Sequence, residues 1–246
     1  MDLGLAGKNA AVAAGSAGLG LGSAKALAAE GARVVICGRD RDRLDAAAAG
    51  IEGDVIPLVA DVGTAEGGAA FIAEAERRLG AIDIVVANCG GPPAGSFAST
   101  GIEAYRTANE LAMLGSIAMC QAAIPAMQER GWGRVVAITS YGVRQPPPQL
   151  IASAAARAGL TAFLKVTARE VAKDGVTVNS VQPGAHDTAR LRGANNDLSA
   201  IARTLPTGVI GDADDFGQAV AFLCSQQARF ITGAALLVDG GASLGV

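Results

Sequence analysis

The stretch AAGSAGLGLGSAKALAAEGARVVICGRD, from Ala13 to Asp40, decides the fold. It opens with closely spaced glycines, continues as an alanine-rich helical pattern and ends in the apolar segment ARVVIC. Glycines let a backbone turn tightly and approach a pyrophosphate, and the helix that follows directs its N-terminus at the phosphate charge. Glycine also serves ordinary tight packing, but at the first strand-to-helix junction of an α/β chain such a turn predicts a nucleotide site.

Outward from this stretch, short apolar runs alternate with longer helical patterns. Most of the runs are β-branched and apolar on both faces, which is typical of strands buried within a parallel sheet. Regular alternation predicts βαβ units, and no linker or repeat divides the chain. We therefore expect a single domain over residues 1–246, an α/β Rossmann-type, doubly wound parallel sheet of about seven strands with helices on both faces. The expected strands are Asn9–Ala14, Ala32–Cys37, Val55–Val59, Ile82–Ala87, Arg134–Thr139, Val176–Val181 and Ala235–Asp239, and the expected helices include Leu21–Glu30, Thr64–Leu79, Leu111–Met127 and Leu150–Asp174.

Composition excludes several classes of protein. Half of the 246 residues are hydrophobic, 17% are charged and the net charge is -3. No run of Lys and Arg marks a surface for nucleic acid or an anionic membrane. Four scattered cysteines and a single histidine predict reduced thiols and no metal site. The N-terminus resembles no signal peptide, and no stretch reaches the roughly 18 uninterrupted apolar residues of a spanning helix. These features favour a cytoplasmic protein.

The end of the second expected strand bears on the choice of dinucleotide. NAD enzymes commonly place an acidic residue there to hold the ribose 2'-hydroxyl. This chain has Gly38 followed by Arg39, whose guanidinium suits a 2'-phosphate. The pattern favours NADP(H) over NAD(H), the alternative being that Arg39 is a solvated arginine opening the charged run 39–43.

Further motifs carry a resemblance to a known family over essentially the whole chain. ADV (Ala60–Val62) follows the third expected strand, and ANCGG (Ala87–Gly91) follows the fourth. REVAKDGVTVNSVQPG (Arg169–Gly184) spans the sixth strand, and FLCSQQARFITGAALLVDGG (Phe222–Gly241) closes the chain. Together these motifs resemble the short-chain dehydrogenase/reductase family, in particular its 3-oxoacyl-acyl-carrier-protein reductase branch.

The resemblance implies cofactor roles for individual residues. The family's glycine motif falls on Ala13–Gly20, with Ala14 in place of its first glycine, a departure that Gly15 is expected to relieve. Arg39 would then hold the 2'-phosphate largely alone, since Ala17 stands where NADPH enzymes often carry a basic residue. The implied positions are Ser16, Ala17, Gly18, Leu19 and Gly20 at the phosphates, Asp61 and Val62 at the adenine, Asn88 and Gly90 at the adenine ribose, and Pro183, Gly184 and Thr188 at the nicotinamide.

The family's catalytic residues are an Asn, a Ser and a Tyr-x-x-x-Lys pair, and most of them are changed here. Ser140 matches the serine. Ser153 stands at the tyrosine, Arg157 at the lysine and Ala112 at the asparagine. The chain thus resembles a divergent branch of the family that has Ser-x-x-x-Arg in place of Tyr-x-x-x-Lys and Gly-Gly-Pro after the fourth strand, as at residues 90–92.

These replacements change the proton chemistry. In the family, the tyrosine protonates the carbonyl oxygen and the lysine ammonium lowers the tyrosine pKa. A serine hydroxyl is a far weaker acid, and a guanidinium keeps its proton. Arg157, four residues after Ser153 on a helix, lies on the same face and can still stabilise negative charge. Tyr141 and His186 are candidate replacement donors; the alternatives are a tyrosine packed on the proline-rich loop and a histidine turned away from the site.

Two functions of different classes follow. The first is an NADP(H)-dependent oxidoreductase that acts on a small-molecule carbonyl or hydroxyl, possibly conjugated or a β-dicarbonyl, with Ser140, Ser153 and Arg157 at its catalytic site. The second is an NADP(H)-binding protein without redox turnover, either a sensor or an inactive partner in an oligomer. The family usually forms tetramers, so the resemblance also implies a homo-oligomer, most simply a homotetramer.

Overall fold

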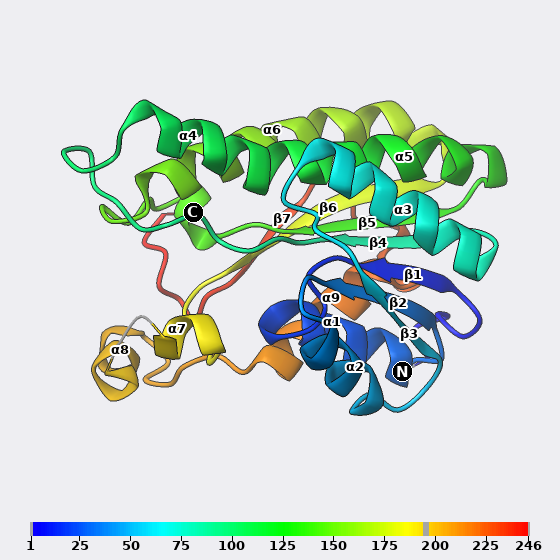
Figure 1. Cartoon of the computed structure of the whole chain (residues 1–246), viewed down its shortest axis with the longest axis horizontal. Coiled ribbons are helices and arrows are strands. Elements are labelled where there is room, and N and C mark those ends of the chain that lie inside the picture. Colours follow the sequence, from blue (N-terminus) through cyan, green and yellow to red (C-terminus); the bar gives the residue numbers. More distant parts are fainter. Residues whose placement is uncertain (1, 194–196, 246) are drawn as a thin grey trace.

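The fold is a single parallel β-sheet with helices on both faces, seen in a computed structural model that describes residues 2–193 and 197–245 (Figure 1). The strand order β3-β2-β1-β4-β5-β6-β7 confirms the predicted doubly wound sheet of seven strands. The strands are β1 (Asn9–Val12), β2 (Arg33–Gly38), β3 (Val55–Val59), β4 (Ile84–Ala87), β5 (Gly133–Ile138), β6 (Val176–Pro183) and β7 (Ala235–Val238).

Two hydrophobic layers hold the helices to the sheet. Figure 1 shows α1, α2 and α9 on one face, with α3, α5 and α6 on the other. The α-helices are α1 (Gly18–Ala29), α2 (Arg41–Ala49), α3 (Ala65–Leu79), α4 (Ile102–Asn109), α5 (Gly115–Arg130), α6 (Ile151–Val171), α7 (Ala189–Gly193), α8 (Leu198–Thr204) and α9 (Ala213–Cys224). The π-helical turn η1 (Glu110–Leu114) and the 3-10 turns η2 (Tyr141–Val143), η3 (Ala172–Asp174) and η4 (Gln227–Phe230) complete the described elements.

Burial along the strands follows their place in the sheet. Every residue of β4, β5 and β6 is buried, whereas the edge strands β3 and β7 are largely half-buried. This confirms that runs apolar on both faces are central parallel strands. Side chains of the central strands alternate between the layer under α3, α5 and α6 and the layer under α1 and α9.

The helices α1 and α9 are in close backbone contact. A Cβ atom added at Gly22 of α1 would collide with the backbone carbonyl of Ala213, and one at Gly217 of α9 would collide with the carbonyl of Gly22. The two glycines therefore let the helices approach backbone to backbone. This packing fixes the start of α1, and with it the turn that precedes it.

The observed boundaries differ from the predicted ones where the backbone turns. β1 ends at Val12 and not at Ala14, because Ala14 adopts a left-handed conformation. α1 begins at Gly18, before the predicted Leu21. The predicted helix Leu111–Met127 is interrupted by the π-helical turn, and the long helix predicted to end at Asp174 closes in the 3-10 turn η3.

One helical run among the described residues resembles a membrane-spanning helix in its length and composition. The run Ile102–Arg130 is long enough to cross a bilayer, and an 18-residue window within it has a mean hydropathy of 1.3. The α5 part of this run packs on α3 and on the sheet, and Met119, Cys120 and Met127 lie in the core. We therefore interpret the run as a core helix of the α/β fold.

Candidate active site

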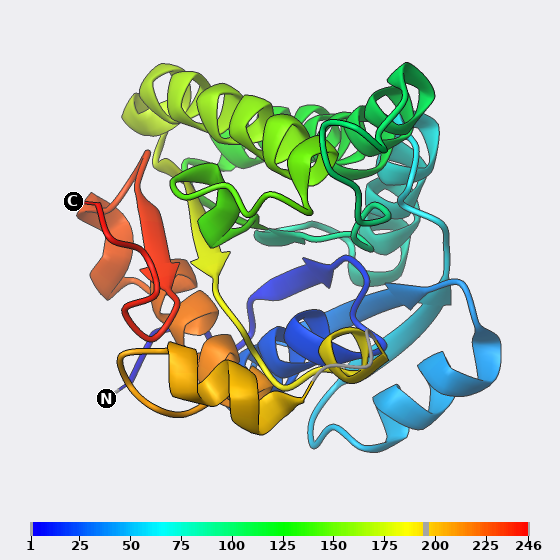
Figure 2. The ribbon, with the colours of Figure 1, turned by 90° about the vertical axis from the view of Figure 1, so that its left-hand side faces the viewer.

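The predicted site residues follow the carboxyl ends of six neighbouring strands. Parallel strands end at the same edge of a sheet, and in doubly wound folds ligands bind at this edge, where the strand order reverses between β1 and β4. Figure 2 shows α7 and α8 lying across this edge below α6. The first predicted site residue after each strand is Ser16 after β1, Arg39 after β2, Asp61 after β3, Asn88 after β4, Ser140 after β5 and Gly184 after β6.

The turn between β1 and α1 fits a pyrophosphate. A side chain at Gly20 would collide with the carbonyl of Ala14 and lie 2.8 Å from Asn88 Nδ2. Ala17 precedes α1 in an extended conformation, and no side chain caps the first turn of this helix within the described residues. The N–H groups of that turn are thus left for an anion, the arrangement by which helix N-termini bind phosphate.

The conformation of Ala14 corrects one expectation. Ala14 has φ +48° and is the only non-glycine residue with positive φ between residues 2 and 193 or 197 and 245. Gly15 does not take over this conformation; its N–H donates to the carbonyl of Cys37 at 2.8 Å. The expected relief by Gly15 is therefore wrong, and alanine itself carries the strain at the family's first glycine.

Replacing Ala14 by glycine is expected to stabilise the protein. Left-handed backbone costs an L-residue about 1–2 kcal/mol, and the larger entropy of an unfolded glycine offsets about 0.4–1 kcal/mol of the gain. We expect Ala14→Gly to raise the free energy of unfolding by about 1 kcal/mol, measured by urea denaturation. Ala14→Val serves as the opposite control and should lower it; an Ala14→Gly variant no more stable than wild type would contradict the assigned strain.

The adenosine end brings Arg39 and Asp61 together. Arg39 Nη1 lies 3.9 Å from Asp61 Oδ2, and the side chains are 75% and 61% exposed, so the pair itself contributes little stability. A Cβ atom at Gly38 would lie 2.8 Å from Ser16 Oγ, which leaves little room for an acidic side chain there. Val62 differs from its neighbours, because its side chain is buried in the core and only its backbone can face an adenine.

The loop after β6 returns to the phosphate turn. Thr188 Cγ2 would lie 3.2 Å from a Cβ atom built at Gly18, so the two predicted cofactor positions are neighbours. Gly184 packs against the backbone of Asp239 and donates its N–H to the carbonyl of Val238 at 2.9 Å. A Cβ atom built at Gly90 would meet no atom within 4 Å. The loop after β6 therefore lies beside the phosphate turn, and Gly90 borders open space.

The predicted Ser-x-x-x-Arg pair forms on one face of α6. Arg157 Nη1 donates to Ser153 Oγ at 2.6 Å, and each residue is only 8% exposed. Arg157 Nη2 also reaches Cys89 Sγ at 3.9 Å. Burial raises the pKa of the Cys89 thiol, although the charges of Arg157 and Arg190 partly counter this effect. The thiol therefore stays neutral and does not balance the guanidinium charge.

Ser140 begins the turn η2 and is half-buried. Its Oγ accepts a hydrogen bond from the N–H of Gly142 at 3.0 Å. The hydroxyl proton is left for another acceptor, because this contact uses only an oxygen lone pair. Ser140 thus keeps a donor near the end of β5, as the family's serine does by resemblance.

Ala112 lies inside the π-helical turn and contributes no polar atom. It is 1% exposed and packs with Ala108, Ala152 and Ala156 in a small cluster between η1 and α6. A π-bulge within a longer helix often accompanies a functional site. Here the backbone irregularity is present where the family's asparagine is expected, while the side chain fills space against α6.

Neither candidate proton donor, Tyr141 or His186, makes a hydrogen bond to Ser153 within the described residues. The pKa of Tyr141 is raised by burial and by the charge of Asp239. The ring of His186 packs edge-on against Phe216 of α9, with centroids 5.1 Å apart, and its Nδ1 lies 3.2 Å from the carbonyl of Gly184. Burial lowers the pKa of His186. The His186 ring therefore contacts α9 and the loop after β6, away from the Ser153–Arg157 pair.

Sequence reasoning missed Arg190. This residue follows Thr188 on α7, and its Nη1 and Nη2 each donate at 2.9 Å, to the carbonyls of Gly91 and Pro92 respectively. Burial lowers the pKa of Arg190, and the charge of Arg157 adds to the effect. In the sequence, Arg190 is recognisable only as a basic residue close to the expected nicotinamide motif. Nothing in the sequence shows that α7 turns toward the loop after β4.

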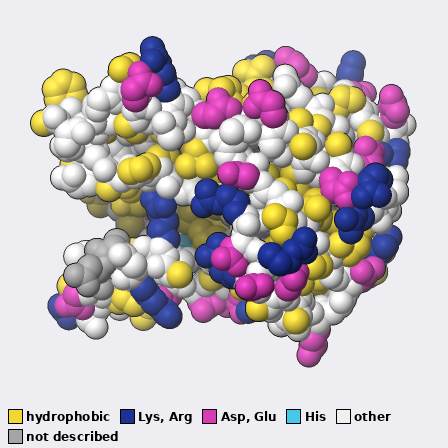
Figure 3. Space-filling view, in the orientation of Figure 1, with side chains coloured by type: hydrophobic (Ala, Val, Ile, Leu, Met, Phe, Trp, Pro, Cys, Tyr) yellow, Lys and Arg dark blue, Asp and Glu magenta, His cyan; other side chains and the backbone are white. Residues whose placement is uncertain are grey.

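The surface between these elements is hollowed. Figure 3 shows a deep recess between the α4–α6 side and the α7–α8 segment, with hydrophobic side chains in its wall and Lys or Arg side chains inside it. Among the described residues no group of three or more His, Cys, Asp or Glu side chains could hold a metal ion. The recess therefore offers apolar surface and positive charge.

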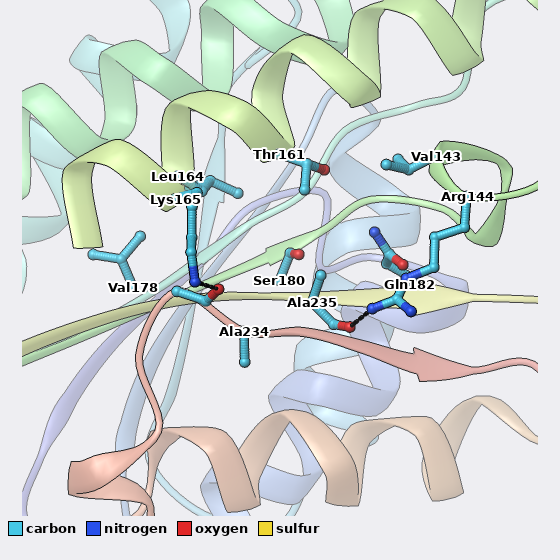
Figure 4. A pocket seen from close by; sticks show the side chains of 11 residues that line it. Val143, Arg144, Thr161, Leu164, Lys165, Val178, Ser180, Gln182, Ala234 and Ala235 are labelled. Atoms are coloured by element: carbon cyan, nitrogen blue, oxygen red, sulfur yellow. Dashed lines mark hydrogen bonds between the residues drawn. The ribbon is translucent and has the colours of Figure 1, made fainter. Parts of the chain in front are cut away.

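A separate pocket lies between α6 and the edge of the sheet. It measures about 330 Å³, and Lys165 and Arg144 border it, each donating to a backbone carbonyl, of Gly233 at 2.9 Å and of Ala235 at 3.0 Å (Figure 4). Gln182 of β6 points into this region, is fully buried and has neither side-chain polar atom hydrogen-bonded within the described part of the chain. Lys165 thus lies at this pocket and does not replace the family's catalytic lysine.

Comparison with known proteins identifies the family. Residues 13–243 match the family described as enoyl-(acyl carrier protein) reductase. A 3-oxoacyl-[acyl-carrier-protein] reductase of Bos taurus is 32% identical over 238 residues, covering 96% of this chain and 98% of the relative.

Two solved structures are also similar to this chain. The L-sorbose reductase from Gluconobacter frateurii, complexed with NADPH and L-sorbose, has a TM-score of 0.93 and 28% identity, with 100% of both chains covered. An NADPH-bound short chain oxidoreductase from Pseudomonas aeruginosa PAO1, described as containing an atypical catalytic center, has a TM-score of 0.91 and 30% identity, covering 98% of this chain and 100% of the other. The fold, the sequence and the position of the site at the carboxyl edge of the sheet all agree with these relatives. The protein belongs to the short-chain dehydrogenase/reductase family.

Proposed function

We propose that the protein is an NADP(H)-dependent oxidoreductase acting on a carbonyl or hydroxyl of a small molecule through an altered catalytic set. The observation that carries this proposal is the guanidinium of Arg157, buried beside Ser153 in a fold whose first strand-to-helix turn fits a pyrophosphate. A buried charge is costly unless something compensates it. A ligand that develops negative charge at this point would supply the compensation.

The residues of this chain would hold both reactants. When bound, NADPH supplies a hydride. The first turn of α1, with Gly18 and Gly20, would bind the pyrophosphate, and the loop through Thr188 would close over it. Arg157 and Ser140 would hold the substrate oxygen and stabilise the charge that forms on it, as preorganised donors do in oxyanion holes.

The absence of a strong acid at position 153 narrows the range of carbonyl substrates that the site can reduce. A serine hydroxyl does not readily release a proton near neutral pH, and a positioned general acid is commonly worth 10²–10⁴-fold in rate. Hydride addition to the β-carbon of a conjugated carbonyl, such as an enone or the enol form of a β-dicarbonyl, leaves the negative charge delocalised on an enolate, which Arg157 could stabilise until water provides the proton. We therefore propose a conjugated carbonyl or β-dicarbonyl as substrate.

A matched pair of ketones tests this preference. With NADPH and 2-cyclohexenone, or with its saturated analogue cyclohexanone, we expect NADPH oxidation by the enone to be faster by about 10²-fold or more. NADPH absorbance reports both rates. Equal rates would contradict the preference for a delocalised anion, whereas a saturated ketone reduced efficiently would show that a proton donor acts at the site.

Selection of NADPH is proposed to depend on Arg39. Replacing it in Arg39→Asp should weaken NADPH binding by about 10²-fold, because charge-assisted hydrogen bonds are worth about 1.5–3 kcal/mol and the new carboxylate repels the 2'-phosphate. NADH affinity should not fall, because NADH has no 2'-phosphate. Fluorescence titration with each dinucleotide measures the change.

The matched control for this prediction is Arg41→Asp, which reverses the charge of a nearby exposed arginine. Arg41 pairs with Asp45 on its own helix, at 3.5 Å from Nη1 to Oδ1. Its variant should keep NADPH affinity within about threefold, a difference of less than 1 kcal/mol. Similar losses in both variants would indicate that the general field of the charged run, and not Arg39, attracts the cofactor.

The alternative function is binding of NADP(H) without redox turnover, as a sensor or an inactive oligomer partner. The replaced positions Ser153 and Ala112 favour it, and the intact cofactor turn is compatible with both functions. Tight NADPH binding with no oxidation of the cofactor by either ketone, or by a β-dicarbonyl such as acetylacetone, would favour this alternative.

Assembly and location are proposals that follow from the family. We propose a homo-oligomer, most simply a homotetramer, in the cytoplasm. The half-buried edge strand β7 and its exposed Leu236 offer apolar surface for such an assembly. Sedimentation equilibrium would give the mass of the assembly directly.

A further inference from the structure

Two guanidinium groups converge on one short loop of the recess. Arg157 approaches from α6 and reaches Cys89 Sγ at 3.9 Å. Arg190 approaches from α7 and donates to the carbonyls of Gly91 and Pro92, both at 2.9 Å. The loop after β4 is thus contacted by two arginines from different elements, α6 and α7, which lie well apart in Figure 1.

Among the described residues, neither guanidinium has an acidic partner. Within the described residues, no carboxylate oxygen lies within 4.0 Å of Arg157 or Arg190 in an ion pair. By contrast, Arg192 on the same helix α7 pairs with Asp187, at 2.6 Å from Nε to Oδ1. Arg157 is buried, whereas Arg190 is exposed. Two like charges near each other oppose each other, and desolvation adds to the cost for Arg157. An anion placed between them would remove both penalties.

Both side chains retain donors for such an anion. A guanidinium has five N–H donors, and the hydrogen bonds described above use only two on each arginine. The phosphate-binding turn lies at Gly18 and Gly20, and Arg39 lies at the end of β2, so the cofactor's phosphates are expected at other groups. The anion that meets Arg157 and Arg190 would therefore belong to the substrate.

We propose that the recess binds a carboxylate on Arg190, so that the substrate is an oxo acid whose carbonyl oxygen meets Arg157. This inference rests on the proposed function and specifies its substrate class. A carboxylate close to the carbonyl fits, because the two arginines meet on the same loop. Arg190 Nη1 and Nη2 each give one donor to the loop carbonyls, and the remaining N–H groups of the guanidinium can bind a carboxylate, which guanidinium groups favour.

A pair of isosteric probes tests the proposal without turnover. Malonate and the neutral malonamide are titrated into the protein with saturating NADP+ at constant ionic strength, and binding is followed by calorimetry. We expect malonate to bind at least about tenfold more tightly than malonamide, a difference of about 1.4 kcal/mol or more. Malonate binding no tighter than that of malonamide would overturn the proposal.

Variants of Arg190 test whether this residue causes the preference for malonate over malonamide. Arg190→Gln should weaken malonate binding at least about tenfold and leave malonamide binding unchanged. Arg190→Lys should recover part of the lost malonate affinity because it keeps the positive charge. Arg203→Gln, at an exposed arginine of α8, is the matched control and should leave malonate binding within about twofold. Unchanged malonate affinity in Arg190→Gln would also overturn the proposal.

The affinity for NADP+ separates this inference from the proposed function. Wild-type protein that binds no NADP+ would count against the oxidoreductase while the malonate comparison could still succeed in the free protein. Arg190→Gln should bind NADP+ as wild type does, which also shows that the variant is folded. If the variant instead lost NADP+ affinity and kept malonate affinity, Arg190 would serve the cofactor and the oxo-acid inference would be wrong.

Discussion

The double variant Ser153→Tyr/Arg157→Lys is expected to reduce a saturated ketone such as cyclohexanone about 10²-fold faster than the wild-type protein. The reason is that it restores a general acid, which is worth about 10²–10⁴-fold. Ser153 and Arg157 already share one face of α6, with Oγ and Nη1 2.6 Å apart. A lysine ammonium four residues after the tyrosine would lower the tyrosine pKa toward neutrality. The comparison is of kcat/KM, followed by NADPH absorbance.

The control for this variant has the same bulk without the acid. Ser153→Phe/Arg157→Lys adds an aromatic ring at position 153 but no hydroxyl, so it should show no gain. Absence of a gain in the tyrosine variant would count against a remodelled oxidoreductase site. An equal gain in the phenylalanine variant would mean that shape, and not proton donation, limits the wild-type protein.

Replacement of Arg157 by methionine is expected to raise stability and lower activity together. The Arg157 guanidinium is buried with only a hydroxyl and a thiol as described neighbours. Apolar replacement of buried charges can stabilise a protein by about 1–4 kcal/mol, so we expect a gain of about 1–3 kcal/mol in the free energy of unfolding. Loss of the group that stabilises the substrate oxygen should lower kcat/KM for 2-cyclohexenone about 10²-fold or more.

A second buried arginine provides the matched control. Arg134 is 2% exposed, donates to the carbonyls of Gly133, Ser225 and Gly175, and stacks on the ring of Trp132 at 4.4 Å. Arg134→Met leaves these carbonyls without their donor and should destabilise the protein by about 3 kcal/mol. Opposite signs of the two stability changes are the expected result of urea denaturation. A loss of stability in both variants would indicate that Arg157 is structural.

Much of the fold was predictable because its signals are periodic or local. The fully buried strands β4, β5 and β6 were visible as apolar runs, and the glycine turn located the first junction. The shared face of Ser153 and Arg157 was predictable from helix geometry alone. The conformation of Ala14 was not, because only the completed turn shows which residue must adopt positive φ.

The features that could not be predicted from the sequence depend on contacts between segments that are far apart along the chain. Arg190 meets Gly91 and Pro92 from across the recess, and no local pattern gives the direction of α7. The orientation of His186 against Phe216 is likewise set by a neighbour far along the chain. Side-chain direction in loops is decided by tertiary packing, and this limits prediction of a proton donor more than prediction of a cofactor turn.

The most direct test of the central claim is an equilibrium titration of the wild-type protein with NADPH and, separately, with NADH. The intact glycine turn and Arg39 at the end of β2 predict that NADPH binds at least about tenfold more tightly than NADH, a difference of about 1.4 kcal/mol or more. Binding of NADH as tight as that of NADPH would contradict the role assigned to Arg39. Binding of neither dinucleotide would contradict the oxidoreductase and the cofactor-binding alternative together.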